Sequence, residues 1–494
     1  MSNGPLFPAV AAGGSAPAVS FGARGLDYAR LRAAVLATAA RLGGARRVAL
    51  WATPTLETAV GVVAALAAGV TVVPLNPKSG ERELAHVVGD SAPELVLAAA
   101  DDELPGVLAG LRVVTPQLSA DGPDSEAPWP AEPDDESPAL IIYTSGTTGP
   151  PKGAIVPRRA VRTTLDALAE AWAWTGGDVL VHALPLFHVH GLVLGILGPL
   201  RRGGSVRHLG RFSPEGVRDE LANGATMLFG VPTMYHRIAQ DLDAGDAGLA
   251  KALAGARLLV SGSAALATRD QRAIEAATGR RVVERYGMTE TLMNTSVRPG
   301  ADHRPGTVGT PLDGVELRLV DEAGMPFDAA DVRAGGIRDG ETVGEIQVRG
   351  ANLFSGYLNR PDATADAFAE DGWFRTGDMA VLDPDGAVRI VGRKSTDLIK
   401  SGGYKIGAGE IENVLQEHPA VAEAAVTGEP DPDLGERVVA WIVPADPAAP
   451  PSADELAVHV AAHLAPHKRP REVRHVPALP RNDMGKVMKR ALGA

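Results

Sequence analysis

The chain has 494 residues, of which 45% are hydrophobic and 22% are charged. This composition predicts a globular protein with large buried cores, divided into two or more domains. The formal net charge of −12 argues against a nucleic-acid partner, because binding a phosphate backbone requires an excess of Lys and Arg. The sequence has no cysteine, which excludes disulfides and thiolate metal sites and fits a reducing, cytoplasmic location.

The N-terminal 20 residues have no basic segment ahead of an apolar core, so they do not predict a signal peptide. The longest apolar stretch, Ala59 to Leu75, is interrupted by Gly61, Gly69 and Pro74. This pattern favours a buried helix that ends at Gly69 and a buried strand after it, rather than a membrane span. We therefore expect no membrane partner.

Short apolar strand candidates alternate with Ala- and Leu-rich helical segments through the first 300 residues. This alternation is typical of parallel sheets covered by helices, and it predicts two doubly wound α/β subdomains. The expected strands are Arg47–Trp51, Val70–Val73, Leu95–Ala98, Ala139–Tyr143, Leu180–Leu184, Thr226–Phe229, Arg257–Val260 and Val282–Arg285. The Pro- and acid-rich run from Asp121 to Pro138 is expected to be an exposed connection.

From about Thr307 the strands are separated by turn residues, which predicts a more antiparallel part, a distorted β-barrel. A small α+β domain is expected after it, with its last helix capped by Ser452. The predicted organisation is therefore a large N-terminal domain over residues 1–391, a hinge over 392–397 and a small mobile C-terminal domain over 398–494. The strands and helix expected here are Val315–Val320, Gly344–Arg349, Ala387–Val391, a helix over 408–417, Val421–Thr427 and Arg437–Val443.

The segment from Tyr143 to Gly153 follows an apolar strand and combines glycines, hydroxyls and one lysine. Glycines let backbone amides approach phosphate oxygens, hydroxyls donate hydrogen bonds, and a lysine adds charge, so the segment suits an oligophosphate. Its spacing differs from that of a Walker A loop, and a mobile surface turn is the alternative. The candidate phosphate ligands are Thr144, Ser145, Gly146, Thr147, Thr148 and Lys152.

With this loop the sequence resembles the adenylate-forming superfamily of acyl-CoA synthetases, luciferases and nonribosomal-peptide adenylation domains. The resemblance covers nearly the whole chain, and its motifs occur in the family's order. They are the stretch Leu66–Pro77, the loop above, Tyr286–Glu290, Gly344–Gly350, Tyr357, Trp373–Asp378, Gly392–Arg393, Ser401–Tyr404 and Asn482–Lys486.

The resemblance implies an ATP-dependent acid–thiol ligase that needs ATP, Mg²⁺ and coenzyme A. A carboxylate attacks the α-phosphate of ATP to give an acyl adenylate and pyrophosphate, and coenzyme A then takes the acyl group. The family assigns catalysis to Lys486, Thr289 and Glu290, with Glu290 also holding Mg²⁺. Besides the phosphate loop, the implied nucleotide ligands are Gly262, Ser263, Ala264, Glu284, Tyr286, Gly287, Met288, Thr289, Asp378 and Arg393.

Two of these assignments have an explicit alternative or reason. Asp378 follows a Thr-Gly turn, where a carboxylate can accept both ribose hydroxyls, although a turn-capping aspartate would look the same. Gly262, Ser263 and Ala264 follow a buried strand, and small residues there would let the backbone pack against adenine.

The resemblance also implies rotation of the C-terminal domain between the two half-reactions, which withdraws Lys486 and presents a coenzyme A segment. The implied hinge residues are Lys394, Ser395, Thr396 and Asp397, and the implied coenzyme A residues are Lys400, Ser401, Gly402, Gly403 and Tyr404. The spacing from Arg393 to Gly402 is one residue longer than the commoner family pattern, so the pivot is assigned to the four hinge residues together.

The acid is predicted from polar groups where relatives with fatty or aryl substrates need apolar ones. A fixed guanidinium reads a carboxylate with two hydrogen bonds, and burying it unpaired beside a fatty tail would cost several kcal/mol. These stretches resemble malonyl-CoA synthetases most, which implies that Arg285, Arg237 and His190 bind the distal carboxylate of malonate or methylmalonate. The alternatives are an exposed helical arginine for Arg237, and packing histidines rather than metal ligands for His188 and His190.

Competing functions are another short-chain acyl-CoA synthetase, an adenylation domain that loads a carrier protein, and a catalytically silent nucleotide-binding protein. The chain shows no carrier domain after Ala494, and Phe187–Gly191 offers histidines where an amino-acid substrate would need an acidic partner. Malonate and methylmalonate are not separated by the sequence, because one methyl group changes binding by only about 1–3 kcal/mol. The oligomeric state is not predicted.

Overall fold

The first sheet of the computed structural model has seven strands in the order β18-β8-β7-β4-β3-β5-β6. The model describes residues 4–118, 127–144, 150–300, 305–327, 342–394, 397–481 and 487–492. Strands β7, β4, β3, β5 and β6 are parallel, and β8 and β18 add an antiparallel edge. The bounds are β3 (Arg47–Trp51), β4 (Thr71–Leu75), β5 (Leu95–Leu97), β6 (Arg112–Val114), β7 (Pro138–Thr144), β8 (Lys152–Pro157) and β18 (Gly356–Tyr357).

The second sheet has nine strands in the order β15-β14-β13-β12-β11-β9-β10-β1-β2. Its parallel centre runs from β13 to β1, and the strands at both ends pair antiparallel. The two α/β sheets predicted from the sequence are therefore confirmed. The bounds are β1 (Pro17–Phe21), β2 (Arg24–Asp27), β9 (Val179–His182), β10 (Ser205–His208), β11 (Met227–Gly230), β12 (Leu258–Ser261), β13 (Val282–Tyr286), β14 (Thr295–Ser296) and β15 (Thr310–Pro311).

Helices cover both sheets, and the largest hydrophobic core contains side chains from β3 and β4 of one sheet and β9, β11 and β12 of the other. A second core lies under α7 to α10, on the other face of the nine-stranded sheet. The bounds are α1 (Pro8–Ala12), α2 (Tyr28–Ala40), α3 (Leu56–Ala67), α4 (Glu81–Ser91), α5 (Arg158–Trp172), the π-helix η3 (His190–Leu197), α6 (Gly198–Arg202), α7 (Pro214–Ala222), α8 (Pro232–Asp243), α9 (Ala247–Gly255) and α10 (Thr268–Thr278).

The long apolar stretch folds as predicted into a helix, a glycine stop and a strand. Thr55 caps α3 by accepting a hydrogen bond from the Thr58 amide, and Gly69 ends the turn with a φ of 74°. Strand β4 follows and is buried throughout. In the described ranges, no helix has the length and apolarity that crossing a bilayer requires.

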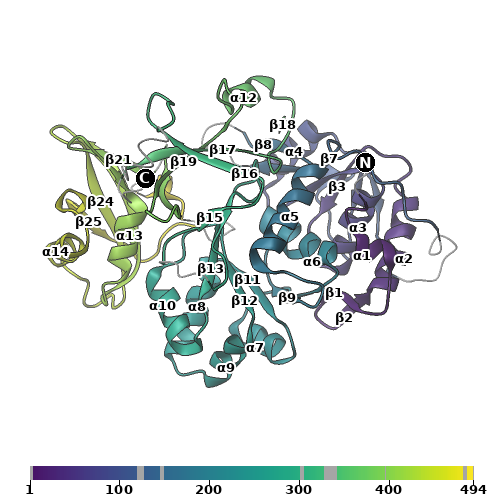
Figure 1. Ribbon diagram of the computed structural model, residues 1–494, viewed down its shortest axis with the longest axis horizontal. Helices are drawn as coiled ribbons and strands as arrows, with labels where there is room; N and C mark the ends of the chain where they lie inside the picture. The colour runs from purple at the N-terminus through teal and green to yellow at the C-terminus, as the bar shows by residue number, and fades with distance from the viewer. Residues whose placement is uncertain are drawn as a thin grey trace.

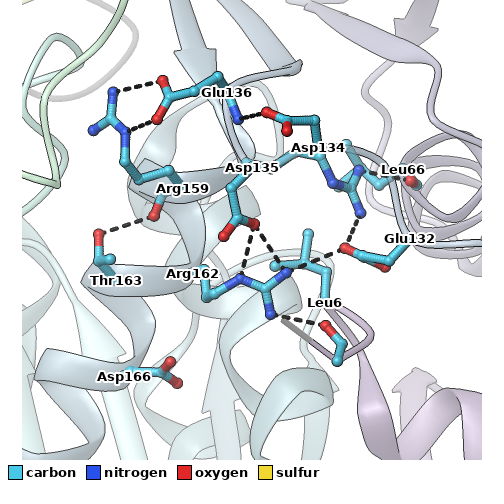
Figure 2. A network of polar contacts seen from close by, with 12 residues as sticks. Leu6, Leu66, Glu132, Asp134, Asp135, Glu136, Arg159, Arg162, Thr163 and Asp166 are labelled. Carbon is cyan, nitrogen blue, oxygen red and sulfur yellow. Dashed lines mark hydrogen bonds and ion pairs between the residues drawn. The ribbon is translucent and has the colours of Figure 1, made fainter. Parts of the chain in front are cut away.

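The connection before α5 is more ordered than predicted. Figure 2 shows its carboxylates around the arginines of α5. Arg158, buried, donates to the Leu66 carbonyl at 2.7 Å and pairs with Glu132. Arg162 pairs with the same Glu132 and with Asp135. This part of the acidic run, predicted as an exposed connection, instead neutralises buried guanidinium groups.

The third sheet is antiparallel, as predicted, with the order β16-β17-β19-β20. Within the described residues it is an open sheet, so the predicted closure into a barrel is not found. Its bounds are β16 (Val315–Val320), β17 (Gly344–Gly350), β19 (Phe374–Leu382) and β20 (Val388–Arg393), with α12 (Pro361–Asp366) beside it.

The C-terminal elements form a separate sheet with its own core, at one side of the molecule in yellow and light green (Figure 1). Ser452 caps α14 as predicted, by accepting from the Glu455 amide. The bounds are β21 (Leu398–Ser401), β22 (Tyr404–Gly407), α13 (Ala408–Gln416), β23 (Val421–Asp431), β24 (Gly435–Pro444), α14 (Ala453–His463), the short helices η4 (Pro466–Lys468) and η5 (Lys489–Ala491), and β25 (Glu472–His475).

Candidate active site

Strand β13 carries an arginine that is buried without a partner. Alternation along the strand puts Val282 in the core under α10 and Val283 in the core between the sheets, so Arg285 points toward the latter. Arg285 is 6% exposed, and its Nε and Nη2 atoms have no hydrogen-bond partner among the described residues. Burial lowers its pKa to about 10. Such a cation demands an anion, because an unpaired buried charge is costly.

Space for the Arg285 side chain comes from Gly262, just after the neighbouring strand β12. The register pairs Ser261 with Glu284, so Gly262 lies beside Arg285. A Cβ atom on Gly262 would stand 2.3 Å from the guanidinium carbon, closer than any real contact. Gly262 was predicted as an adenine ligand, and the structure gives it an additional role at the arginine.

His190, at the start of the π-helix η3, is the second unpartnered polar group in this region. It is 5% exposed, and neither ring nitrogen finds a partner in the part of the chain that the structure describes. Burial first, and the charge of Arg285 second, hold its pKa well below the usual value. His190 is therefore a neutral imidazole near a bare guanidinium, and together they can bind an anionic group.

Arg237, the other predicted carboxylate ligand, is not brought into this cluster. It lies on the exposed side of α8, and it has no hydrogen bond or ion pair among the described residues. Its neighbour His236 faces Asp270 at 3.0 Å. His188 packs its ring against Phe187, with centroids 4.3 Å apart. The geometry thus agrees with the exposed-arginine alternative for Arg237.

A cation, a phenol and a carboxylate meet beside the phosphate loop. The Tyr357 hydroxyl donates to Glu290 Oε1 at 2.8 Å, and Lys152 Nζ stands 4.8 Å from the centre of the Tyr357 ring. Strand β18 places Tyr357 opposite Ala154 of β8, next to Lys152. Burial and the Glu290 charge raise the pKa of Tyr357, so it remains a donor. Glu290 is thereby held as a buried carboxylate whose second oxygen can face a ligand.

A single carboxylate suits Mg²⁺ bound mainly by phosphate oxygens and water. Mg²⁺ usually keeps several waters and takes one or two protein carboxylates besides substrate phosphates. Among the described residues, no group of three or more His, Cys, Asp or Glu could enclose a metal ion by itself. Glu290 fits such a shared site, with the nucleotide supplying the remaining charge.

Asp378 and Arg393 face each other across the pair β19 and β20, where the register makes them direct neighbours. Arg393 Nε lies 2.7 Å from Asp378 Oδ1, and the Tyr286 hydroxyl donates to Oδ2 at 2.6 Å. Burial lowers the pKa of Arg393, but the Asp378 charge outweighs it and leaves the pKa raised. Each carboxylate oxygen has a further lone pair that can accept a ribose hydroxyl.

The predicted adenine segment is a strained loop held by Glu284. Ser263 has a φ of 75°, which is unfavourable for a residue with a side chain, and Ala264 follows it. Glu284 Oε2 accepts from the Leu266 amide at 3.1 Å, and burial raises its pKa to about 7. The Glu284 carboxylate is therefore occupied by the backbone, so only its main chain is open to the predicted nucleotide contact.

The other predicted residues are placed as follows. Gly287 lies against the Leu292 carbonyl, where a Cβ atom would stand 1.8 Å away. Met288 packs with the core of the third sheet, and Thr289 follows it directly before Glu290. Thr144 ends β7, and Lys394 pairs with Glu345 at 2.7 Å. Ser145, Gly146, Thr147, Thr148, Ser395, Thr396 and Lys486 lie outside the described residues.

The predicted coenzyme A segment is the hairpin of β21 and β22. Ser401 pairs with Tyr404, and Gly402 and Gly403 make the turn with positive φ. Lys400 Nζ lies 3.6 Å from Glu322. The Tyr404 ring is 54% exposed and stacks on His467, with centroids 4.0 Å apart. His467 was not predicted, because a stacking partner 63 residues away leaves no local signal.

Comparisons with known proteins agree with this geometry. The family model described as "AMP-binding enzyme" matches residues 7–358, and "AMP-binding enzyme C-terminal domain" matches 410–486. A human relative named malonate–CoA ligase ACSF3, mitochondrial, is 37% identical over 453 residues, which cover 86% of this chain and 78% of the relative.

Two solved structures are informative together. A malonyl-CoA ligase in a ternary product complex with methylmalonyl-CoA and AMP is 68% identical and has a TM-score of 0.73, covering 96% of this chain and all of that one. ATP-bound MatB from Rhodopseudomonas palustris is 34% identical and has a TM-score of 0.88, covering 99% of this chain and 98% of that one. The more similar sequence thus has the less similar structure.

Proposed function

We propose that this chain, which belongs to the family of AMP-binding enzymes, is an ATP-dependent malonate–CoA ligase that also accepts methylmalonate. Malonate and ATP give malonyl adenylate and pyrophosphate, and coenzyme A then gives malonyl-CoA and AMP. The observation that carries the proposal is the unpartnered buried pair Arg285 and His190. Relatives whose names specify malonate–CoA ligase or a methylmalonyl-CoA complex support the same substrate class.

The first half-reaction brings one anion against another, so its catalysis depends on fixed positive charge and alignment. Lys152 and the phosphate loop would hold the β- and γ-phosphates, and Mg²⁺ held by Glu290 would supply further neutralising charge when bound. Asp378 and Arg393 would orient the ribose, and Thr289 the α-phosphate. Lys486 would stand between the substrate carboxylate and the α-phosphate in this step.

The distal carboxylate of malonate would bind Arg285 and His190. A guanidinium with two free N–H groups can make a bidentate pair with a carboxylate, and the neutral imidazole can donate one more hydrogen bond. A monocarboxylate would leave the guanidinium buried and unpaired, which costs several kcal/mol and excludes fatty acids.

We also propose that the domain boundaries are residues 1–391, 392–397 and 398–494, and that the last of these rotates between the half-reactions. The two TM-scores support this, because the chain matches an ATP-bound structure better than a product complex of greater sequence identity. The hairpin with Lys400, Ser401 and Tyr404 would then face coenzyme A in the second half-reaction.

The cellular location is proposed to be the cytoplasm, although the human relative is named as mitochondrial. Fractionation of cells that express the natural gene, with detection of the protein in each fraction, checks this separately from the activity.

The direct test of the function is a coenzyme A thioester assay with malonate, methylmalonate, succinate, acetate and octanoate. We expect thioester and AMP from malonate and methylmalonate, with rates for acetate and octanoate roughly 100-fold lower or less, because they leave Arg285 unpaired. Activity that is highest with acetate or octanoate would overturn the dicarboxylate proposal. Absence of ATP–pyrophosphate exchange with every acid would overturn the ligase itself.

A further inference from the structure

A lysine that no family motif assigned lies at the centre of the contacts around the hinge. Lys489 Nζ is 2.8 Å from Asp397 Oδ1 and 2.7 Å from Glu412 Oε1, and its side chain is 16% exposed. Burial alone would lower its pKa, but the two carboxylates outweigh burial and leave the pKa raised. Lys489 is therefore a charged group between two carboxylates of opposite location, one at the hinge and one on α13.

The Glu412 side of this contact is fixed to the C-terminal domain. Glu412 Oε1 also accepts from the Val426 amide at 2.7 Å, which ties it to β23. The chain on both sides of Lys489 is anchored as well, since Val487 and Leu492 pack beside Trp441 on the C-terminal sheet. Lys489 therefore moves with the C-terminal domain.

The Asp397 side of the contact continues to the nucleotide site. Asp397 Oδ2 accepts from the Arg393 amide at 3.0 Å, and the Asp397 amide donates to the Arg393 carbonyl at 2.8 Å. The Arg393 side chain in turn pairs with Asp378. An unbroken series of polar contacts thus runs from Asp378 through Arg393, Asp397 and Lys489 to Glu412.

We propose that Lys489 is a positioning residue that holds the hinge in the arrangement required for adenylation. It does so by fixing the carboxylate of Asp397, which is bonded to Arg393 on the other side of the hinge. Without the ammonium group, Asp397 and Glu412 would be two neighbouring, poorly solvated carboxylates that repel each other, so the hinge carboxylate would leave its place. Lys486 lies three residues before Lys489 and depends on the same arrangement.

This inference rests on the proposed ligase function, and its test separates the two half-reactions. Lys489→Met should lower malonate-dependent ATP–pyrophosphate exchange by roughly tenfold or more, through misplacement of the reacting groups. Thioester formation from supplied malonyl adenylate and coenzyme A should fall by less than about threefold, since it uses the other arrangement. Lys489→Arg should restore most of the exchange, and Lys486→Ala gives the reference for lost adenylation.

The matched control is Arg474→Met, which also removes a cation that bridges two carboxylates, Glu429 and Glu472, but on β25 and away from the hinge. A purely structural role for Lys489 would give equal losses in both half-reactions, or the same losses as Arg474→Met, and would overturn the proposal. A parent protein without exchange would instead overturn the ligase function.

A second readout does not depend on activity. Because Lys489 holds Asp397 against Arg393, the lysine variant should expose the hinge to trypsin, which cleaves after Arg393 and Lys394. We expect Lys489→Met to be cut there several-fold faster than the parent and Arg474→Met. Equal rates of hinge cleavage in all three proteins would contradict a role at the hinge.

Discussion

Arg285 decides the choice of acid, because it is the buried cation whose Nε and Nη2 lack partners among the described residues. Replacing it by leucine removes the charge and two donors while keeping an apolar side chain of moderate size. Arg285→Leu should lower kcat/KM for malonate by roughly 100-fold, as expected for a lost bidentate ion pair in a dry site. Propionate, which has no second carboxylate, should lose far less, and rates of thioester formation with both acids measure the difference.

A parallel fall for malonate and propionate would contradict this specificity role and point to damage of the neighbouring nucleotide loop. Arg237→Leu, measured with the same two acids, is the informative companion because Arg237 lies on the exposed side of α8. A selective loss of malonate activity there would restore it as a substrate ligand despite its exposed position.

Sequence reasoning identified the residues of this site better than their contacts. Arg285 follows a buried strand directly, so the alternation of side chains located it. Arg237 was grouped with it by resemblance alone, and a helix surface position has no such geometric constraint. Lys489 was missed because its two partners are 92 and 77 residues away in the chain, where spacing carries no signal.

At the scale of elements, the π-helix η3 positions His190, and its first turn requires a glycine. A Cβ atom on Gly191 would stand 2.1 Å from the Pro185 carbonyl oxygen, which is backbone and cannot move aside cheaply. Gly191→Ala should therefore lower the free energy of unfolding by about 1–3 kcal/mol, the usual cost of overpacking. It should also raise KM for malonate, since His190 is the adjacent residue. Chemical denaturation and steady-state kinetics measure the two effects.

Gly89 in α4 supplies the control with the opposite sign. Nothing lies within 4 Å of a Cβ atom at this exposed position, so Gly89→Ala should stabilise the protein by about 0.5–1 kcal/mol through helix propensity. Similar effects of the two alanines would show that the close contact at Gly191 is relieved by backbone movement.

Element prediction worked where burial forces a continuous apolar run. Strand β3 was predicted with its observed bounds, and the strands of the two central sheets were found within about two residues, as expected for such boundaries. The edge strands β1 and β2 were not predicted, because their partner β10 is about 185 residues away. The barrel was overpredicted because turn-separated strands look alike in open and closed sheets.

At the scale of the whole molecule, three buried histidines set a dependence of stability on pH. Burial, as the largest cause for each, holds the pKa of His182 and His190 well below 6.5 and lowers that of His208 to about 4. As pH falls below 6.5 the unfolded chain takes up these protons first, so stability falls. Glu284 acts oppositely: burial raises its pKa from 4.5 to about 7, so its contribution is lost as pH rises through that range.

Three groups against one leave a net uptake of about two protons on unfolding near pH 5.5, which makes stability rise with pH by on the order of 3 kcal/mol per unit. Glu284→Gln removes the opposing group while its amide oxygen can still accept from the Leu266 amide. The variant should therefore show a steeper slope, by about 1.4 kcal/mol per pH unit. Urea denaturation of both proteins at several values between pH 5 and 6.5 measures the slopes. Equal slopes would mean that Glu284 is ionised in the folded protein, with a carboxylate stabilised by the Leu266 amide more strongly than burial destabilises it.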